Sequence, residues 1–238
     1  MTKETLVLLP GMMCDERLFA PQVKHFSERY FVMTPSLNNA SSIEAMANLC
    51  LAQLPDTPVN LAGLSMGGIV AMQMAVNAPD QIKRLALLDT NCKADAPERF
   101  EIRNIQMEKV RAGQLREVII EEMKPNYVAE QNRSNQDLLD LLVEMAMDVG
   151  AEAFMNQSLA LRDREKLCGR LFDISCPTLV MCGEEDRLCP LAFHEEIASF
   201  VPDAELEIIK HAGHITTLEN PEAVNAALEK WLKRKPMN

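Results

Sequence analysis

Short apolar runs alternate with helical patterns along most of this chain. Continuous apolar runs of four to six residues are typical of buried strands, and a run that alternates apolar with polar is typical of a half-exposed strand. The expected strands are Thr5–Leu9, Tyr30–Met33, Val59–Ala62, Arg84–Leu88, Pro177–Cys182 and, with alternation, Ala204–Ile209. The helical patterns between them span Leu18–Phe26, Ile43–Leu54, Ile69–Asn77, Leu191–Phe200 and Pro221–Lys233. This order predicts an α/β fold, with helices on both faces of a mostly parallel central sheet.

The alternation stops between residues 92 and 175, where every pattern is helical. The expected helices there are Pro97–Ala112, Gln114–Lys124, Gln136–Val149 and Ala151–Arg164. We therefore expect a core formed by residues 1–91 and 176–238, and a helical cap inserted as residues 92–175. The insertion is rich in methionine, which either packs among these helices or lines a pocket for irregular acyl groups. These residues are Met107, Met123, Met145, Met147 and Met155.

Composition narrows the class of protein. The 238 residues are 47% hydrophobic and 25% charged, which suits one globular unit with a substantial core. The net charge of −11 argues against nucleic acid as a partner, because binding to a phosphate backbone needs clustered Lys and Arg. The first apolar run, Leu6–Leu9, is too short for a signal peptide, and no run has the length of a membrane span. We expect a cytoplasmic protein without membrane contact.

The seven cysteines are scattered and include no Cys-x-x-Cys pair. This pattern predicts reduced thiols, as in the cytosol, and neither a disulfide framework nor a zinc site. Among the four histidines, His211 and His214 have no nearby cysteine or acid that would complete a set of metal ligands. We therefore expect no metal.

One stretch carries a candidate nucleophile. The strand that ends at Ala62 leads through Gly63-x-Ser65-x-Gly67 directly into a helix, with a further glycine at position 68. A strand that turns at once into a helix strains the turn residue, and its neighbours must lack a Cβ for the two arms to pass closely. By itself the pattern also fits a flexible turn, but its strand–turn–helix context favours an exposed, reactive serine.

A serine hydroxyl needs an imidazole to take its proton, and the imidazole needs a carboxylate to orient it. In an open parallel sheet, such groups meet at the carboxyl ends of strands. Ser65, Asp186 and His214 each follow an expected strand, in that order. Two competitors remain: His211 as the base, and Asp89 as the acid.

Four motifs resemble those of the α/β-hydrolase superfamily, specifically its small cap-bearing esterases and carbon–carbon bond hydrolases. They are Leu-Leu-Pro-Gly-Met at 8–12, Gly-Leu-Ser-Met-Gly-Gly at 63–68, Gly-Glu-Glu-Asp-Arg-Leu-Cys-Pro at 183–190, and Ala-Gly-His at 212–214 followed by Leu-Glu-Asn-Pro at 218–221. They frame nearly the whole chain. Two departures weaken transfer of any one relative's substrate. The first expected strand begins at Thr5, which implies that the family's two leading antiparallel strands are shortened or missing. Pro10 precedes Gly11 where many relatives have His.

The resemblance implies a role for each matching residue. Ser65 becomes the nucleophile, His214 the general base and then acid, and Asp186 the carboxylate that orients it. The oxyanion hole becomes the backbone N–H groups of Met12 and Met66. No metal or organic cofactor is implied. The resemblance favours His214 over His211, while His25 and His194 lie on expected helices, where a solvated or hydrogen-bonded structural histidine is ordinary.

We therefore expect a serine hydrolase that cleaves a small carboxylic ester or thioester through an acyl-enzyme intermediate. The alternatives are a carbon–carbon bond hydrolase or lyase with the same three residues, and a non-catalytic ligand-binding member of the fold. Basic residues in the insertion predict a solvated helix face or, alternatively, a contact with an acyl carrier protein. They are Arg99, Arg103, Lys109, Arg111 and Arg116. The sequence does not reveal the oligomeric state.

Overall fold

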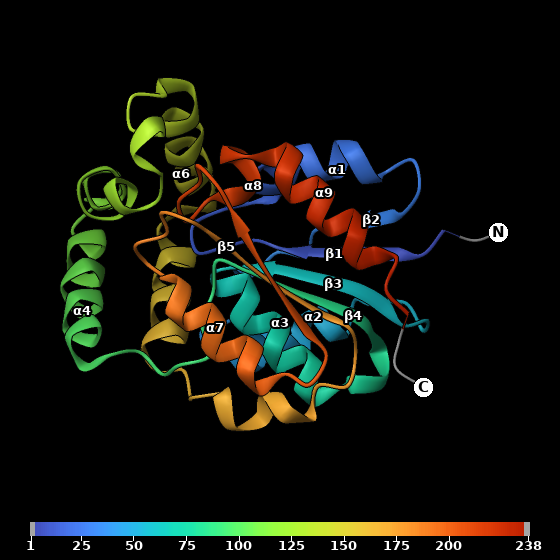
Figure 1. Cartoon of the computed structure of the whole chain (residues 1–238). Coiled ribbons are helices and arrows are strands. Elements are labelled where there is room, and N and C mark those ends of the chain that lie inside the picture. The colour runs from blue at the N-terminus through green and yellow to red at the C-terminus, as the bar shows by residue number, and fades with distance from the viewer. Residues whose placement is uncertain (1–2, 236–238) are drawn as a thin grey trace.

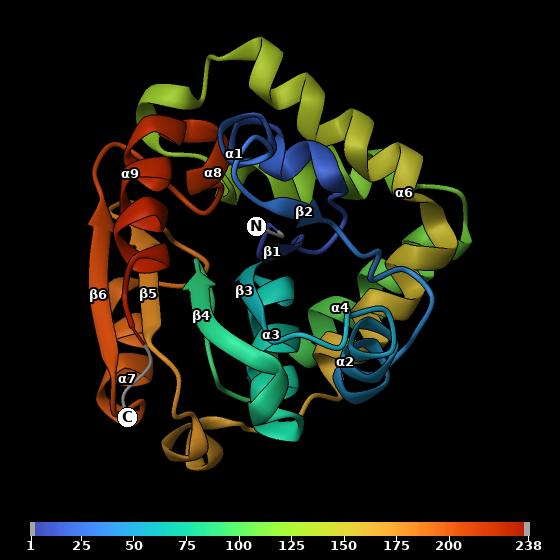
Figure 2. The same ribbon diagram turned by 90° about the vertical axis from the view of Figure 1, so that its right-hand side faces the viewer.

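The computed structural model describes residues 3–235 and contains one six-stranded sheet in the order β2-β1-β3-β4-β5-β6. Every neighbouring pair of strands is parallel (Figure 2). The bounds are β1 (Thr5–Leu9), β2 (Phe31–Met33), β3 (Val59–Leu64), β4 (Ile82–Leu88), β5 (Thr178–Gly183) and β6 (Ala204–Ile209). The predicted α/β fold is confirmed, and the sheet is parallel throughout.

Helices cover both faces of this sheet (Figure 1). On one face lie α1 (Ala20–Phe26), α8 (Thr216–Glu219) and α9 (Pro221–Leu232), and on the other lie α2 (Ile43–Leu51), α3 (Met66–Asn77) and α7 (Leu191–Phe200). Because side chains alternate along a strand, Leu6 and Leu8 pack beneath α1 and α9, whereas Val7 and Leu9 face α2 and α3. The four inner strands are almost entirely buried, because helices cover both faces.

Residues 92–175, all of which the structure describes, form helices and turns but no strand. The helices are α4 (Pro97–Arg111), α5 (Leu115–Glu117) and α6 (Gln136–Arg162), which bends at Gly150, and they are joined by a π-helical turn (Val118–Met123) and by 3-10 turns (Lys124–Asn126, Glu130–Asn132, Cys168–Asp173). Further 3-10 turns lie at Glu16–Phe19 and Pro79–Gln81. In Figure 1, α4 and α6 lie beyond the carboxyl ends of the strands. The division into core and cap stays a prediction.

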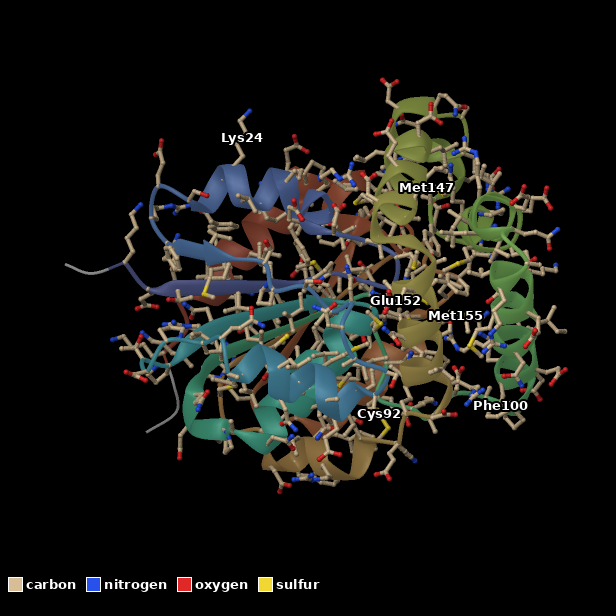
Figure 3. The ribbon with its side chains drawn as sticks, turned by 180° about the vertical axis from the view of Figure 1, so that it is seen from behind. Lys24, Cys92, Phe100, Met147, Glu152 and Met155 are labelled. Atoms are coloured by element: carbon tan, nitrogen blue, oxygen red, sulfur yellow. A yellow bond between two sulfur atoms is a disulfide. The ribbon has the colours of Figure 1, made fainter. Side chains whose placement is uncertain are left out.

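The insertion is closed at its base by a disulfide between Cys92 and Cys168. Figure 3 labels Cys92 below α6. The prediction that all seven cysteines are reduced is therefore wrong, because the chain returns to β5 beside the point where it left β4. The remaining five cysteines are free. Within residues 3–235, no helix combines the length and the apolar character needed to cross a membrane.

The methionines of the insertion divide between the two expectations. Met107 and Met145 are buried in the core, whereas Met123 lines a pocket. Met155 packs at the edge of the core, and Met147 is exposed. Figure 3 shows Met155 and Met147 on α6, with α4 on its outer side.

Candidate functional site

The turn between β3 and α3 holds Ser65 in a strained conformation. Its φ is 55° and its ψ is −116°, backbone angles that residues with a Cβ rarely adopt. A Cβ on Gly63 would overlap the carbonyl of Gly67, and a Cβ on Gly67 would overlap the carbonyl of Leu9. The glycines thus let strand and helix pass closely while Ser65 stands clear of both. The carbonyl of Ser65 also accepts a hydrogen bond from the Thr90 hydroxyl at 2.7 Å.

The structure brings Ser65, His214 and Asp186 together in one chain of hydrogen bonds. His214 Nε2 lies 2.9 Å from Ser65 Oγ, and His214 Nδ1 lies 2.8 Å from Asp186 Oδ2. With its proton on Nδ1, the imidazole donates to Asp186 and accepts from the serine hydroxyl. The arrangement can move a proton from the hydroxyl to Nε2 while the carboxylate stabilises the imidazolium that forms.

Asp186 is held by the loop that follows β5. Its Oδ1 accepts the backbone N–H groups of Leu188 at 2.8 Å and Cys189 at 2.9 Å, which leaves Oδ2 to face the imidazole. The side chain has no solvent-exposed surface. Because both oxygens are used, the carboxylate is fixed in position.

Electrostatics around the imidazole favour its charged form. Burial by itself lowers the pKa of His214, but the charge of Asp186, the hydrogen bond to it and the charge of Asp89 together raise the pKa above its ordinary value of 6.5. A ring with a raised pKa is a stronger base towards a serine hydroxyl, at the cost of needing a higher pH to be neutral.

The competing acid, Asp89, does not contact the imidazole. Its Oδ1 accepts the N–H of Gly183 at 2.9 Å, and its Oδ2 accepts the hydroxyl of Thr216. Burial, and then the charge of Asp186, raise its pKa well above the ordinary value. Asp89 thus joins the end of β5 to the start of α8.

The other histidines lie elsewhere. His211 is exposed and its backbone carbonyl accepts from Gln131, while His25 pairs with Glu229 at the surface. His194 is fully buried, accepts the N–H of Thr90 at 2.9 Å, and has its pKa lowered to about 4 by burial. The structure therefore places neither His211 nor His194 against Ser65.

The predicted oxyanion loop is held from the insertion. Met13, with a φ of 56°, donates its N–H to Gln157 Oε1 on α6 at 2.8 Å. Within residues 3–235, neither the Met12 nor the Met66 N–H has a hydrogen-bond acceptor, so both remain available to a ligand. Gln157 is not among the residues expected from the sequence, where its one signal is a polar position on the helix face that also carries Phe154 and Leu161.

The loop that carries His214 is also tied to the insertion. The N–H of His214 donates to the carbonyl of Tyr127 at 2.8 Å. Glu219 accepts from the N–H of Gly213 at 2.8 Å with one oxygen and from the N–H of Ala129 at 2.7 Å with the other. The position of the imidazole therefore depends on contacts from outside the sheet.

A pocket of about 370 Å³ lies over Ser65 and His214. Its apolar wall is formed by side chains from the core and from the insertion. These are Met12, Leu64, Ile69, Leu188, Phe193 and Ile215 of the core, and Met123 and Leu161 of the insertion. Its polar wall includes Arg103 and Arg164. The pocket is large enough for a small acyl compound.

Arg103 does not lie where the sequence predicted. Arg99, Lys109, Arg111 and Arg116 are exposed, but Arg103 is buried and faces the pocket. The prediction of one solvated basic face is therefore wrong for Arg103, because α4 turns this position inwards. The contact with a carrier protein stays a prediction for the exposed residues.

Among the described residues, one cluster of side chains could hold a metal ion, and it adds Cys189 to Asp186 and His214. One ligand atom each of Asp186, Cys189 and His214 lies within 4.8 Å of the others. Burial and the charge of Asp186 raise the pKa of the Cys189 thiol, so it stays protonated, and both ring nitrogens of His214 already have partners. This donor set suits proton transfer better than metal binding.

Comparison with known proteins identifies a shared fold and shared chemistry. The family model described as "alpha/beta hydrolase fold" matches residues 33–221. The (E)-2-((N-methylformamido)methylene)succinate hydrolase of Acinetobacter baylyi is 28% identical, with 98% of this chain and 92% of that protein aligned. The pimeloyl-[acyl-carrier protein] methyl ester esterase of Chromobacterium violaceum is 26% identical, over 96% and 94% of the two chains.

A solved structure is similar over the whole chain. The malate-bound thermophilic esterase of Thermogutta terrifontis superimposes with a TM-score of 0.91 at 29% sequence identity, covering 98% of this chain and 90% of the esterase. All three are hydrolases by name, and the first two are named for different substrates, so they agree on hydrolysis and not on one substrate.

Proposed function

The chain belongs to the α/β-hydrolase fold family and is a hydrolase, and from this premise we propose that it is a serine hydrolase of small carboxylic esters or thioesters. The observation that carries the proposal is the continuous hydrogen-bond chain from Asp186 through His214 to Ser65 at the floor of the pocket. The order and roles of the three residues are those that nucleophilic acyl transfer needs.

In the proposed first half-reaction, Ser65 Oγ attacks the carbonyl carbon and its proton passes to His214 Nε2. The N–H groups of Met12 and Met66 stabilise the oxyanion of the tetrahedral intermediate. The intermediate collapses by breaking the bond to the alcohol or thiol, which leaves with the proton from His214. An acyl group then remains on Ser65.

In the second half-reaction, water enters and gives a proton to His214 as its oxygen attacks the acyl carbon. The bond to Ser65 Oγ breaks, Oγ takes the proton from His214, and the carboxylic acid leaves. Asp186 stays ionised throughout and stabilises the imidazolium twice in the cycle. No redox step or cofactor is part of this sequence.

The test is Ser65→Ala in a screen of p-nitrophenyl esters of increasing acyl length. We expect the variant to lose ~10⁶-fold in kcat, because the nucleophile is gone while the fold remains. Ser199→Ala, an exposed serine on α7, is the control. Activity of Ser65→Ala close to that of the control would reject Ser65 as the nucleophile.

A carbon–carbon bond hydrolase would use the same three residues, and the geometry suits it equally. Comparing kcat/KM for p-nitrophenyl acetate with kcat/KM for a vinylogous diketone separates the two, because each enzyme turns over its own class of substrate more efficiently. Turnover of the diketone alone would replace the ester proposal.

A further inference from the structure

The pocket over Ser65 is cationic, although the protein as a whole carries a net charge of −11. Five basic side chains line it and only two acidic ones do, namely Lys93, Arg99, Arg103, Arg164 and Arg187 against Asp95 and Glu122. An excess of one sign inside a cleft attracts ligands of the opposite sign more strongly than the same charges on an open surface. The excess of basic side chains therefore favours an anionic ligand in the pocket.

The charges at the rim are mostly compensated by neighbours. Lys93 Nζ lies 2.7 Å from a carboxylate oxygen of Glu196. Glu122 accepts Lys109 Nζ at 2.6 Å. Arg187 lies 3.4 Å from Glu130. These pairs leave the excess to the inner wall and to Arg99.

The inner wall holds two guanidinium groups and one carboxylate. Asp95 accepts Arg103 Nε at 2.6 Å with one oxygen and lies 3.0 Å from Arg164 Nη1 with the other. The three side chains are only 8%, 7% and 5% exposed for Arg103, Arg164 and Asp95 respectively. A single carboxylate cannot neutralise two buried cations, so one positive charge is left over in a place with little water to solvate it.

The environment of Arg164 shows the same excess of positive charge. Burial and the charge of Arg103 lower its pKa, and the opposing effect of Asp95 does not cancel them. Arg164 is nevertheless fixed in place, because Nε donates to the carbonyl of Lys93 and Nη1 to the carbonyl of Leu161, each at 2.8 Å. Arg164 therefore stays in place beside Asp95, the residue that also binds Arg103.

The free end of Arg103 lies beside the predicted oxyanion loop. Its Nη1 is 3.8 Å from Met12 Sδ, and a thioether is a weak acceptor. Within residues 3–235, the two terminal nitrogens of Arg103 have no oxygen acceptor. A buried guanidinium whose terminal N–H groups face a cavity without an acceptor is prepared for an anion.

We propose that Arg103, supported by Arg164 and Asp95, is a subsite for a carboxylate, and that the substrate is an ester or thioester which also carries a free carboxylate. The inference rests on the proposed reaction of Ser65. The buried cluster has one uncompensated positive charge, which matches the single negative charge of a carboxylate. A planar carboxylate also accepts hydrogen bonds from both terminal nitrogens of a guanidinium. Arg99 is exposed and, among the described residues, has no ion-pair partner, so it adds attraction at the entrance.

The first experiment compares two esters of one shape on the wild-type protein: monomethyl glutarate, and its neutral amide, methyl 5-amino-5-oxopentanoate. We expect kcat/KM to be about 10- to 100-fold higher for the carboxylate, the usual strength of a charge-assisted hydrogen bond. Homologues from succinate to pimelate give the spacing between ester and carboxylate. Equal kcat/KM for acid and amide at every length would overturn the subsite and leave the hydrolase proposal standing.

The variant Arg103→Gln locates the effect. It leaves Asp95 paired with Arg164, so the buried cluster becomes neutral, and the ratio of the two kcat/KM values should fall towards one. Arg84→Gln is the matched control, since Arg84 is also 8% exposed but binds Glu4 and Asn60 at the opposite end of the sheet. A ratio that Arg103→Gln leaves at the wild-type value would overturn the assignment to Arg103.

Binding without turnover keeps the subsite testable if neither ester is cleaved or Arg103→Gln fails to fold. Glutarate should raise the melting temperature of the wild-type protein more than glutaramide at equal concentration, and the difference should persist in Ser65→Ala. Equal shifts for glutarate and glutaramide would overturn the subsite. Loss of ester turnover together with a glutarate-specific shift would instead reject only the hydrolase mechanism.

Discussion

Each nitrogen of the His214 ring has one partner, and the two partners differ in charge. Asp186 holds Nδ1 and Ser65 faces Nε2, so a neutral imidazole becomes charged when it takes the proton of the serine. At the scale of single residues, the buried carboxylates of Asp186 and Asp89 set how strong a base His214 is. A substitution at each position measures the contribution of that carboxylate.

The raised pKa of His214 predicts the acid limb of the pH profile. The base must be neutral to accept a proton, so activity should rise with pH through an apparent pKa above 6.5, the ordinary value. The measurement is kcat/KM for a p-nitrophenyl ester between pH 5 and 9. An acid limb centred at or below pH 6.5 would contradict the raised pKa.

The two candidate acids predict different losses. Asp186→Asn should reduce kcat by ~10⁴-fold, because an amide at this position favours the wrong imidazole tautomer. Asp89→Asn should cost about tenfold or less, since it alters hydrogen bonds to Gly183 and Thr216 but not to the ring. Steady-state kinetics of the two variants shows which carboxylate orients His214. A larger loss in Asp89→Asn would make Asp89 the orienting acid.

At the scale of elements, the turn from β3 into α3 is the feature on which the site depends. It is formed where a parallel strand, buried on both faces, meets a helix that is buried nearly all round. The close approach of α3 to β1 leaves no room for a side chain at Gly67, and the backbone of α3 itself leaves none at Gly63.

Gly67→Ala should therefore destabilise the protein. Its Cβ would overlap the backbone of Leu9, which cannot move without disturbing β1, and overpacking of this kind costs ~3 kcal/mol. We expect the melting temperature to fall by about 6–12 °C. The control is Gly169→Ala, where a Cβ meets nothing within 4 Å. A melting temperature equal to that of the control would show that the elbow tolerates a side chain.

At the scale of the whole molecule, the insertion is fastened to the sheet at several points. The disulfide joins its ends, Gln157 reaches the oxyanion loop, and Tyr127 holds the His214 loop. The insertion thus positions two parts of the proposed site and supplies Arg103 to the pocket. A covalent link at its base also removes the cysteine-based argument for a cytosolic protein, since disulfides persist mainly in oxidising compartments.

The disulfide predicts both a thiol count and a stability. Alkylation of the unfolded, unreduced protein should label five cysteines, and seven after reduction. The double variant Cys92→Ser, Cys168→Ser should lose ~2–4 kcal/mol, the usual effect of opening a long loop, and melt about 5–15 °C lower. Cys176→Ser, at a free and partly buried position, is the control. Seven labelled cysteines before reduction would contradict the pairing.

Local features of the chain were sufficient to predict the sheet, the elbow and the placement of Ser65, Asp186 and His214 at one edge. Hydrophobic periodicity and glycine positions act over a few residues, and the carboxyl ends of parallel strands share an edge whatever lies between them. The disulfide and the burial of Arg103 were not predictable in this way. Cys92 and Cys168 are 76 residues apart, and Gln157 lies 144 residues from Met13. Such pairs are brought together only by how α4 and α6 pack over the sheet, because charge and thiol chemistry depend on the neighbours that folding supplies.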